Sequence, residues 1–176
     1  MDLCEFAKTL DVKDMARSTR DYGWETAKRI CKTPQGEIRV TPFSIGKVGY
    51  VKLPPCRPEE KVVGGIHTHT GGEENLFSIS DRFIGLDNKH KIDCLVDPET
   101  ASIKCDILDP DSLTYDQWVE LGFIILKGYR EENILEEKTK GGEVVSDKEL
   151  DTLNTLIDEF EQKAHEYGYL KECPKE

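Results

Sequence analysis

The chain has 176 residues, enough for one domain with a packed core and an appendage. Its 35 acidic and 24 basic residues give a net charge of -11, which argues against nucleic acid as a partner. The hydrophobic fraction of 37% and the charged fraction of 34% predict a compact core under a charged surface, and no segment has the apolar length of a signal peptide or membrane span. The expected location is therefore the cytoplasm, with no membrane partner.

The N-terminal part of the chain predicts a helix followed by a hairpin. Apolar residues recur at helical intervals over residues 2–18, and Gly23 is expected to close this helix. Residues 24–31 and 37–41 have the composition of strands. The turn signal Thr33-Pro34-Gln35-Gly36 lies between them, so the two strands are expected to pair as a hairpin.

The middle of the chain predicts a loop and then a buried strand. Residues 42–60 are rich in proline and glycine, with a candidate short strand at 50–53. The apolar run at 61–66 predicts a buried strand. A short helix is expected over 82–86, with Ser78 at the position of its N-cap.

Two further strands are expected at 91–96 and 101–108, joined by a turn through Pro98, Glu99 and Thr100.

The C-terminal third is expected to be mainly helical. Residues 115–126 predict a helix, and a strand over 122–126 is the alternative because that part is β-branched and aromatic. Residues 136–143 are expected to form a charged linker. Ser146 has a glutamate three residues on, which is a capping box, and the apolar stripe after it predicts an amphipathic helix ending before Gly168.

The six cysteines are scattered through the chain without a Cys-x-x-Cys pair. With no secretion signal, this usage predicts small core residues or free thiols rather than a disulfide framework or a cysteine-type zinc site. The residues concerned are Cys4, Cys31, Cys56, Cys94, Cys105 and Cys173.

Two histidines, His67 and His69, stand one residue apart after the strand expected at 61–66. If the strand continues through them, its two-residue period places both imidazoles on one face. Ser78 and Asp81 follow at a three-residue interval, which puts a carboxylate in the first turn of a helix. Two imidazole nitrogens and one carboxylate oxygen, with a fourth position left for water, are a ligand set suited to hydrolytic zinc.

Each half of this pattern also has a simpler interpretation. A His-x-His pair alone is commonly two exposed polar residues, and Ser-x-x-Asp alone is commonly a helix cap. The joint order favours a metal site. The two remaining histidines, His90 and His165, are expected to be solvated, and the aromatic segment from Trp118 to Tyr129 is expected in a core or an interface.

An upstream glutamate, then His67-Thr68-His69 at a strand end, then Ser78-Ile79-Ser80-Asp81, resembles the motif of the JAMM (MPN+) metalloproteases. The segment Cys94-Leu95-Val96-Asp97-Pro98 is similar to the apolar strand that Asp-Pro closes in that family. The resemblance covers residues 1–108. Two features differ: Thr70 replaces a proline after the second histidine, and eight residues separate that histidine from the serine, one more than in the family.

The resemblance implies a fold and a domain organisation. It implies an α/β (α+β) fold, a cytidine-deaminase-like MPN/JAMM domain over residues 1–110, in which a mixed, curved sheet is flanked by helices. Residues 111–176 would be a C-terminal helical extension ending in an amphipathic helix at 146–167. This extension is expected either to pack on the core or to mediate a homo-oligomer.

The resemblance also implies roles for individual residues. His67, His69 and Asp81 would bind zinc, and Ser78 would help to hold the activated water or the developing oxyanion. Glu25 would be the general base, because the family's glutamate lies on the strand after the first helix with a small residue two positions on. The alternatives for the base are Asp21, Glu37 and Glu59.

The activity that the resemblance implies is zinc-dependent hydrolysis of an amide bond, as an isopeptidase or peptidase that removes a ubiquitin-like modifier. The expected partner is then a protein or peptide substrate, such as a ubiquitin-like conjugate. One alternative is a hydrolase of the same type acting on other peptides, as in toxin or phage systems. Another is a non-catalytic MPN scaffold domain.

Overall fold

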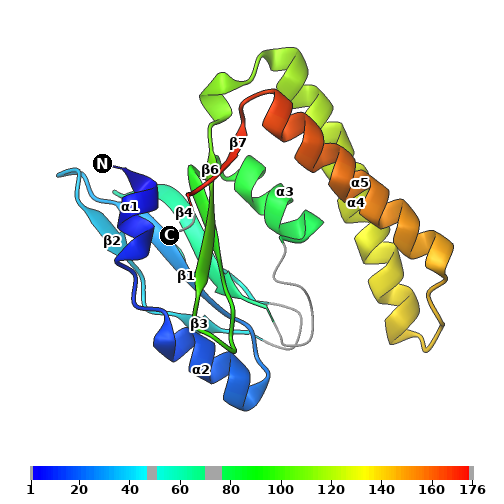
Figure 1. Ribbon diagram of the computed structural model, residues 1–176, viewed down its shortest axis with the longest axis horizontal. Helices are drawn as coiled ribbons and strands as arrows, with labels where there is room; N and C mark the ends of the chain where they lie inside the picture. Colours follow the sequence, from blue (N-terminus) through cyan, green and yellow to red (C-terminus); the bar gives the residue numbers. More distant parts are fainter. Residues whose placement is uncertain (1, 47–50, 70–76, 175–176) are drawn as a thin grey trace.

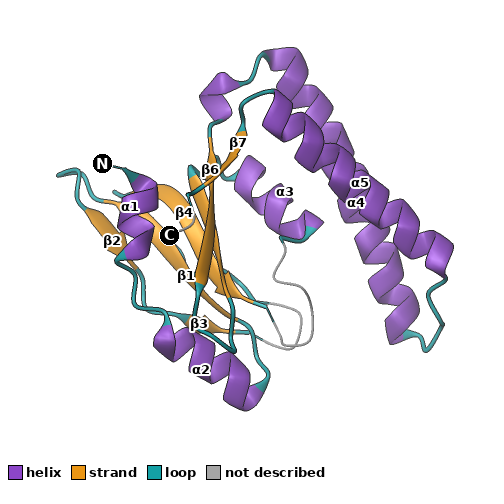
Figure 2. Cartoon of the chain, in the orientation of Figure 1, coloured by secondary structure: helices purple, strands orange, loops and turns teal. Residues whose placement is uncertain are grey.

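The computed structural model describes residues 2–46, 51–69 and 77–174. Here a seven-stranded mixed sheet carries helices on both faces, which confirms the expected α/β class (Figures 1 and 2). The helices span Leu3–Lys8 (α1), Lys13–Tyr22 (α2), Ile79–Asp87 (α3), Tyr115–Lys140 (α4) and Asp147–Glu166 (α5). The strands span Thr26–Lys32 (β1), Ile38–Val40 (β2), Ser44–Ile45 (β3), Lys61–Thr68 (β4), Ile92–Val96 (β5), Ile103–Leu108 (β6) and Leu170–Glu172 (β7).

The sheet order is β2-β1-β4-β5-β6-β7, and β3 pairs with the end of β1 that β2 leaves open. Only β4 and β5 run parallel among these pairs, and α3 connects them. The hairpin expected between β1 and β2 is confirmed, with Gly36 at a φ of 86° in its turn. Glycine suits this position because a positive φ costs it little.

The two faces of the sheet bury different helices. α1 and α2 pack on one face against residues such as Ile30, Ile66 and Cys94. A second core lies between α3, α4 and α5 and reaches β6 and β7 through Leu108 and Leu170. Alternate residues of each strand point to opposite faces, so the two cores use different residues of the same strands.

The expected single helix over residues 2–18 is wrong, because the segment forms two helices. The hydroxyl of Thr9 donates to the carbonyl of Phe6 at 2.7 Å, and the Thr9 backbone N–H uses the same carbonyl at 3.0 Å. This local bonding competes with continuation of the helix. The expected end at Gly23 is confirmed: it has a φ of 72° and its N–H donates to Thr19.

The expectation of a linker over 136–143 is wrong for residues 136–140, because α4 continues to Lys140. Leu135 is buried, and Lys138 pairs with Glu149 of α5 at 2.6 Å, so tertiary contacts extend the helix beyond its apolar part. The alternative strand over 122–126 is excluded by the same helix. The capping box at Ser146 and the helix after it are confirmed.

Two short strands differ from expectation. Residues 51–53 do not form the expected strand, and residue 50 lies outside the described residues. Instead Ser44–Ile45 forms β3. β7 was not expected either; it pairs with β6, so the C-terminal extension contributes a strand to the sheet (Figure 1). A three-residue strand has too little pattern to be recognised in a sequence.

No helix among the described residues is both long enough and apolar enough to cross a membrane.

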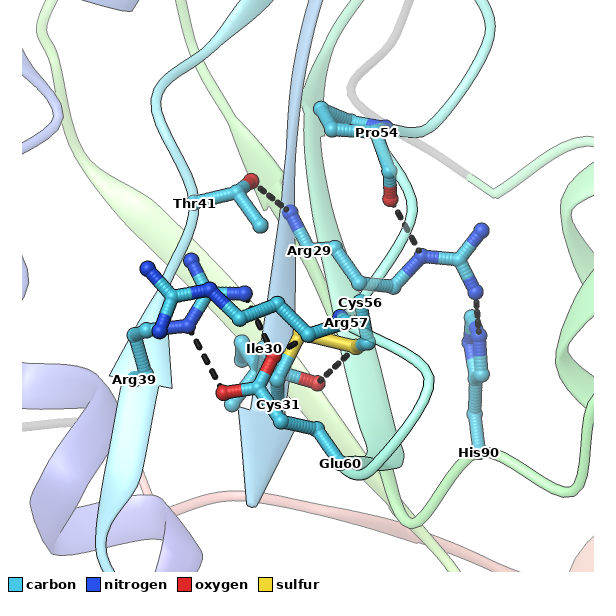
Figure 3. Close-up of a disulfide and its surroundings, with 10 residues drawn as sticks. All are labelled: Arg29, Ile30, Cys31, Arg39, Thr41, Pro54, Cys56, Arg57, Glu60 and His90. Carbon is cyan, nitrogen blue, oxygen red and sulfur yellow. Dashed lines mark hydrogen bonds and ion pairs between the residues drawn. A yellow bond between two sulfur atoms is a disulfide. The ribbon is translucent and has the colours of Figure 1, made fainter. Parts of the chain in front are cut away.

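The expectation of free or core thiols is wrong, because all six cysteines form disulfides. Cys94 and Cys105 face each other across β5 and β6. Cys31–Cys56 ties the segment before β4 to β1, beside the Arg39–Glu60 ion pair (Figure 3). Cys4–Cys173 joins α1 to the residue after β7, where the two ends of the chain lie close together (Figure 1). Pairing of cysteines distant in sequence depends on the fold, so spacing alone does not reveal it.

Replacing both Cys4 and Cys173 with serine is expected to lower the free energy of unfolding by about 5 kcal/mol, because this disulfide closes a long loop in the unfolded chain. Urea denaturation without reductant measures the loss. With reductant present, the variant and the wild type should unfold at the same midpoint. Equal stability in the absence of reductant would contradict the prediction.

Candidate metal centre

The His-x-His pair lies at the end of β4, and the sheet register sets its orientation. His67 pairs with Ala27 of β1 on one side and with Leu95 of β5 on the other. Side chains two residues apart along a strand share a face, so this register places Glu25, two residues before Ala27, on the face of the two histidines. The expected strand thus reaches Thr68, and the acid expected upstream lies at the same end of the sheet.

Thr68, between the two histidines, points to the opposite face and anchors the strand end. Its buried hydroxyl accepts from the backbone N–H of Thr26 at 2.9 Å. It also bonds to the hydroxyls of Thr19 at 2.5 Å and Thr26 at 3.0 Å. α2 and β1 therefore hold the backbone between His67 and His69. Thr68 was not among the residues predicted to form the site, although its position between two candidate ligands indicated that it would help to place them.

The side chains of His67, His69 and Asp81 converge. The Nε2 atoms of the histidines are 2.9 Å apart. Asp81 places Oδ1 3.1 Å from Nε2 of His67 and Oδ2 3.2 Å from Nε2 of His69. All three side chains are mostly buried. The three residues selected from the sequence as metal ligands are therefore brought together by the fold, and they form one of two groups of potential ligands among the described residues.

The donor set fits a zinc ion. Three ligand atoms around a tetrahedral metal, with bonds of about 2.0 Å, lie about 3.3 Å from one another. The separations in this cluster are close to that value. The other group, Cys31, Cys56 and Glu60, does not fit, because its two sulfurs are joined in a disulfide and its carboxylate is bonded to Arg39.

The electrostatics of the cluster favour a cation. Burial raises the pKa of Asp81, but attraction and hydrogen bonds from His67 and His69 outweigh it and hold that pKa far below its usual range. Burial lowers the pKa of His67, but Asp81, and then Asp93 and Glu25, outweigh it and leave that pKa raised. A raised imidazole pKa means that the surrounding charges stabilise positive charge at this point.

Ser78 caps α3 and thereby positions Asp81. The hydroxyl oxygen of Ser78 accepts from the backbone N–H of Asp81 at 3.2 Å. The backbone N–H of Ser78 donates to Oδ2 of Asp81 at 2.8 Å. This reciprocal capping box confirms the expected N-cap and fixes one oxygen of the carboxylate. The role expected for the serine hydroxyl, at a water or oxyanion, stays a prediction.

α3 is held to the rest of the molecule on both sides of Asp81. Ser80 donates through its hydroxyl to the carboxylate of Glu132 on α4. Arg82 is buried and donates to Glu161 of α5 at 2.7 Å and to Asp106 of β6 at 2.8 Å. The C-terminal helices therefore support the helix that carries Asp81.

Glu25 is the acid best placed among the four candidates. It is only 6% exposed and close enough to His67 to raise the pKa of that histidine. Asp21 is exposed and lies beside Arg20. Glu37 and Glu59 are exposed near the opposite end of β1 and β4, a strand length of roughly 20 Å from the histidines.

A buried polar network lies on the same face, one row along the sheet from His67. Arg29, Gly65 and Asp93 are register partners across β1, β4 and β5. Nη1 of Arg29 lies 3.2 Å from Nε2 of His90, and Nδ1 of His90 lies 2.6 Å from Oδ1 of Asp93. Figure 3 shows the Arg29 guanidinium between His90 and the carbonyl of Pro54, to which its Nε donates at 3.1 Å.

The network determines which ring nitrogen of His90 carries the hydrogen. Because arginine only donates, Nε2 of His90 accepts, and Nδ1 carries the hydrogen that is donated to Asp93. His90 is 1% exposed, so the expectation that it is solvated is wrong. The sequence showed only a histidine between two lysines, and its partners come from other strands. The expectation for His165 is confirmed, since it is exposed on α5.

Replacing His90 with leucine is expected to lower the free energy of unfolding by about 3 kcal/mol, because it removes the partner shared by Arg29 and the buried Asp93 carboxylate. Urea denaturation measures the loss. As a control, His165→Leu on the exposed face of α5 should change stability by less than about 0.5 kcal/mol. An unchanged midpoint for His90→Leu would contradict the prediction.

Comparison with known proteins gives no family assignment. No protein-family model matches the chain, and no curated protein is significantly similar to it.

Residues 70–76 lie outside the described residues. The two sequence differences from the JAMM motif, Thr70 and the additional residue before Ser78, therefore concern a segment outside the described residues.

Proposed function

We propose that the chain is a zinc-dependent peptidase or isopeptidase of the JAMM type, with a cytidine-deaminase-like MPN domain. One observation carries the proposal: the side chains of His67, His69 and Asp81 converge at the end of β4, with the buried Glu25 on the same sheet face. Three ligands of this kind leave a fourth position for water, as a hydrolytic zinc site requires.

In this proposal, His67, His69 and Asp81 hold the metal. Zinc bound there would polarise the substrate carbonyl and lower the pKa of a bound water. Glu25 would be the general base that takes the proton from the attacking water and then, as general acid, gives it to the leaving amine. The capping box between Ser78 and Asp81 keeps the carboxylate of Asp81 in place. The hydroxyl of Ser78 is the proposed contact for the activated water or the oxyanion.

The substrate we favour is an amide bond that joins a ubiquitin-like modifier to a protein. The test is a panel of ubiquitin-like conjugates and plain peptides, incubated with zinc-loaded protein, with chelator-treated protein and with chelator-treated protein given zinc again. Cleavage that chelation abolishes and zinc restores supports the proposal. If only plain peptides are cleaved, the substrate is a peptide rather than a ubiquitin-like conjugate. If the folded protein does not bind stoichiometric zinc, the proposal that it is a zinc enzyme is wrong.

The disulfides bear on where such an enzyme works. Disulfides persist in oxidising compartments and also inside hyperthermophilic cells, whereas the ordinary cytosol keeps thiols reduced. The cytoplasmic location expected from the sequence is therefore compatible with three lasting disulfides only if the protein works inside a hyperthermophilic cell. Labelling of free thiols in protein taken directly from its native cells, before and after reduction, distinguishes an oxidised from a reduced chain.

A further inference from the structure

The outer side of α4 is apolar and exposed. Its inner side, including Leu121, Ile124 and Ile125, is buried in the core with α3 and α5. The outer side carries a row that we call the outer stripe, and among the described elements only α3 touches it, where Phe83 stacks on Tyr129. The outer stripe consists of Tyr115, Trp118, Gly122, Leu126 and Tyr129, of which Tyr115 is 77% exposed and Leu126 53%.

The two glycines inside α4 have different environments. A Cβ on Gly128 would lie 2.6 Å from Cγ1 of Ile79, so close packing of α3 accounts for that glycine. A Cβ on Gly122 would meet no atom of the described residues within 4 Å. Glycine weakens the interior of a helix, and it is useful there where another backbone must approach closely. The fold of one chain therefore accounts for Gly128 but not for Gly122.

The outer stripe is symmetric about Gly122. Tyr115 and Tyr129 lie equally far before and after it along the chain, and so do Trp118 and Leu126. When two identical helices cross antiparallel, a residue before the crossing point faces the residue equally far after it. A second copy of α4 centred on Gly122 would therefore place Tyr115 against Tyr129 and Trp118 against Leu126.

We propose that the chain forms a two-fold symmetric dimer in which the α4 helices of two copies cross antiparallel at Gly122. The apolar side chains of the stripe, with the adjacent Phe123, expose roughly 600 Å² per copy. With the polar residues around them, this approaches the roughly 800 Å² that each partner buries in a standard interface. Tyr129 is already stacked on Phe83 of α3 at 4.9 Å, so one end of the stripe is held in place before association.

The test is sedimentation velocity of the full, oxidised chain from low micromolar to hundreds of micromolar concentration. The wild type is expected to form dimers. Gly122→Gln is expected to raise the dimer dissociation constant at least about tenfold, because the added side chain separates the helices. The same change should preserve or raise the unfolding temperature, because glutamine favours a helix more than glycine does. Loss of the dimer would then not reflect misfolding.

A matched control is Asn154→Gln on the exposed side of α5, which should leave the dimer unchanged. Two stripe residues test the antiparallel register: Trp118→Glu and Leu126→Lys should each weaken the dimer. An equimolar mixture of the two variants should dimerise more strongly than either alone, because the mixed dimer keeps one Trp118–Leu126 contact and sets the introduced glutamate of one copy against the introduced lysine of the other. A wild type that stays monomeric throughout would overturn the proposal, as would a dimer insensitive to Gly122→Gln. A mixture that associates no more strongly than the single variants would overturn the crossing at Gly122. Cleavage activity plays no part in this test.

Discussion

Replacing Glu25 with glutamine is expected to reduce hydrolysis by a factor on the order of 100 to 10,000 while zinc stays bound, because the amide keeps the shape of the side chain but cannot take a proton. Glu25 is buried on the sheet face of His67 and His69 and influences the pKa of His67. The measurements are kcat/KM on the best substrate of the panel and zinc content per chain.

The control for Glu25→Gln is Asp21→Asn, which neutralises an exposed acid near the same end of the sheet and should leave kcat/KM unchanged. The unfolding temperature of each variant shows whether the fold is intact. Full activity in Glu25→Gln, with zinc bound, would remove Glu25 from the role of base. The general base would then be one of the other acids predicted from the sequence, and of these only Asp21 lies near this end of the sheet.

Replacing Asp81 with alanine is expected to abolish stoichiometric zinc binding and, with it, hydrolysis. The loss of affinity should exceed the roughly 100-fold that follows removal of an outer-shell partner, because Asp81 is itself a proposed ligand. The variant also loses the acceptor for the backbone N–H of Ser78, which should cost about 1 kcal/mol of stability. Elemental analysis after gel filtration and urea denaturation measure the two effects.

The control for Asp81→Ala is Asp81→Asn, whose amide oxygen can still accept from the Ser78 N–H but carries no charge. It should keep most of the helix cap and still bind zinc poorly. In the metal-free protein both changes should lower the pKa of His67, because attraction by Asp81 helps to raise it. A titration of the histidine signals by NMR measures this shift. Stoichiometric, tightly bound zinc in Asp81→Ala would contradict the ligand assignment.

Local signals in the sequence predicted the local structure around the candidate site. The apolar run at 61–66 predicted β4, and the Ser78 to Asp81 interval predicted the cap of α3. These features depend on neighbouring residues, so a sequence carries them directly. The expectation of one helix before Gly23 was wrong because the short-range bond from Thr9 to Phe6 has no periodic signature.

Long-range pairing could not be read from the sequence in the same way. The partners of His90 come from β1 and β5, and the partners of the six cysteines lie from 11 to 169 residues away. The extension of α4 to Lys140 likewise depends on contacts with α5. In each case the structure is stabilised by interactions between groups that come close together only after folding.

For this protein, the sequence by itself predicted the order of most elements and the candidate ligands His67, His69 and Asp81, and the α/β class was what its resemblance to a known family implied. It could do so because hydrophobic period, caps and motif spacing are properties of short segments. Only the tertiary structure decided that these three side chains converge, that Glu25 shares their sheet face, and that every cysteine is paired. Those outcomes depend on strand register and helix packing, which bring together residues that are remote in the chain.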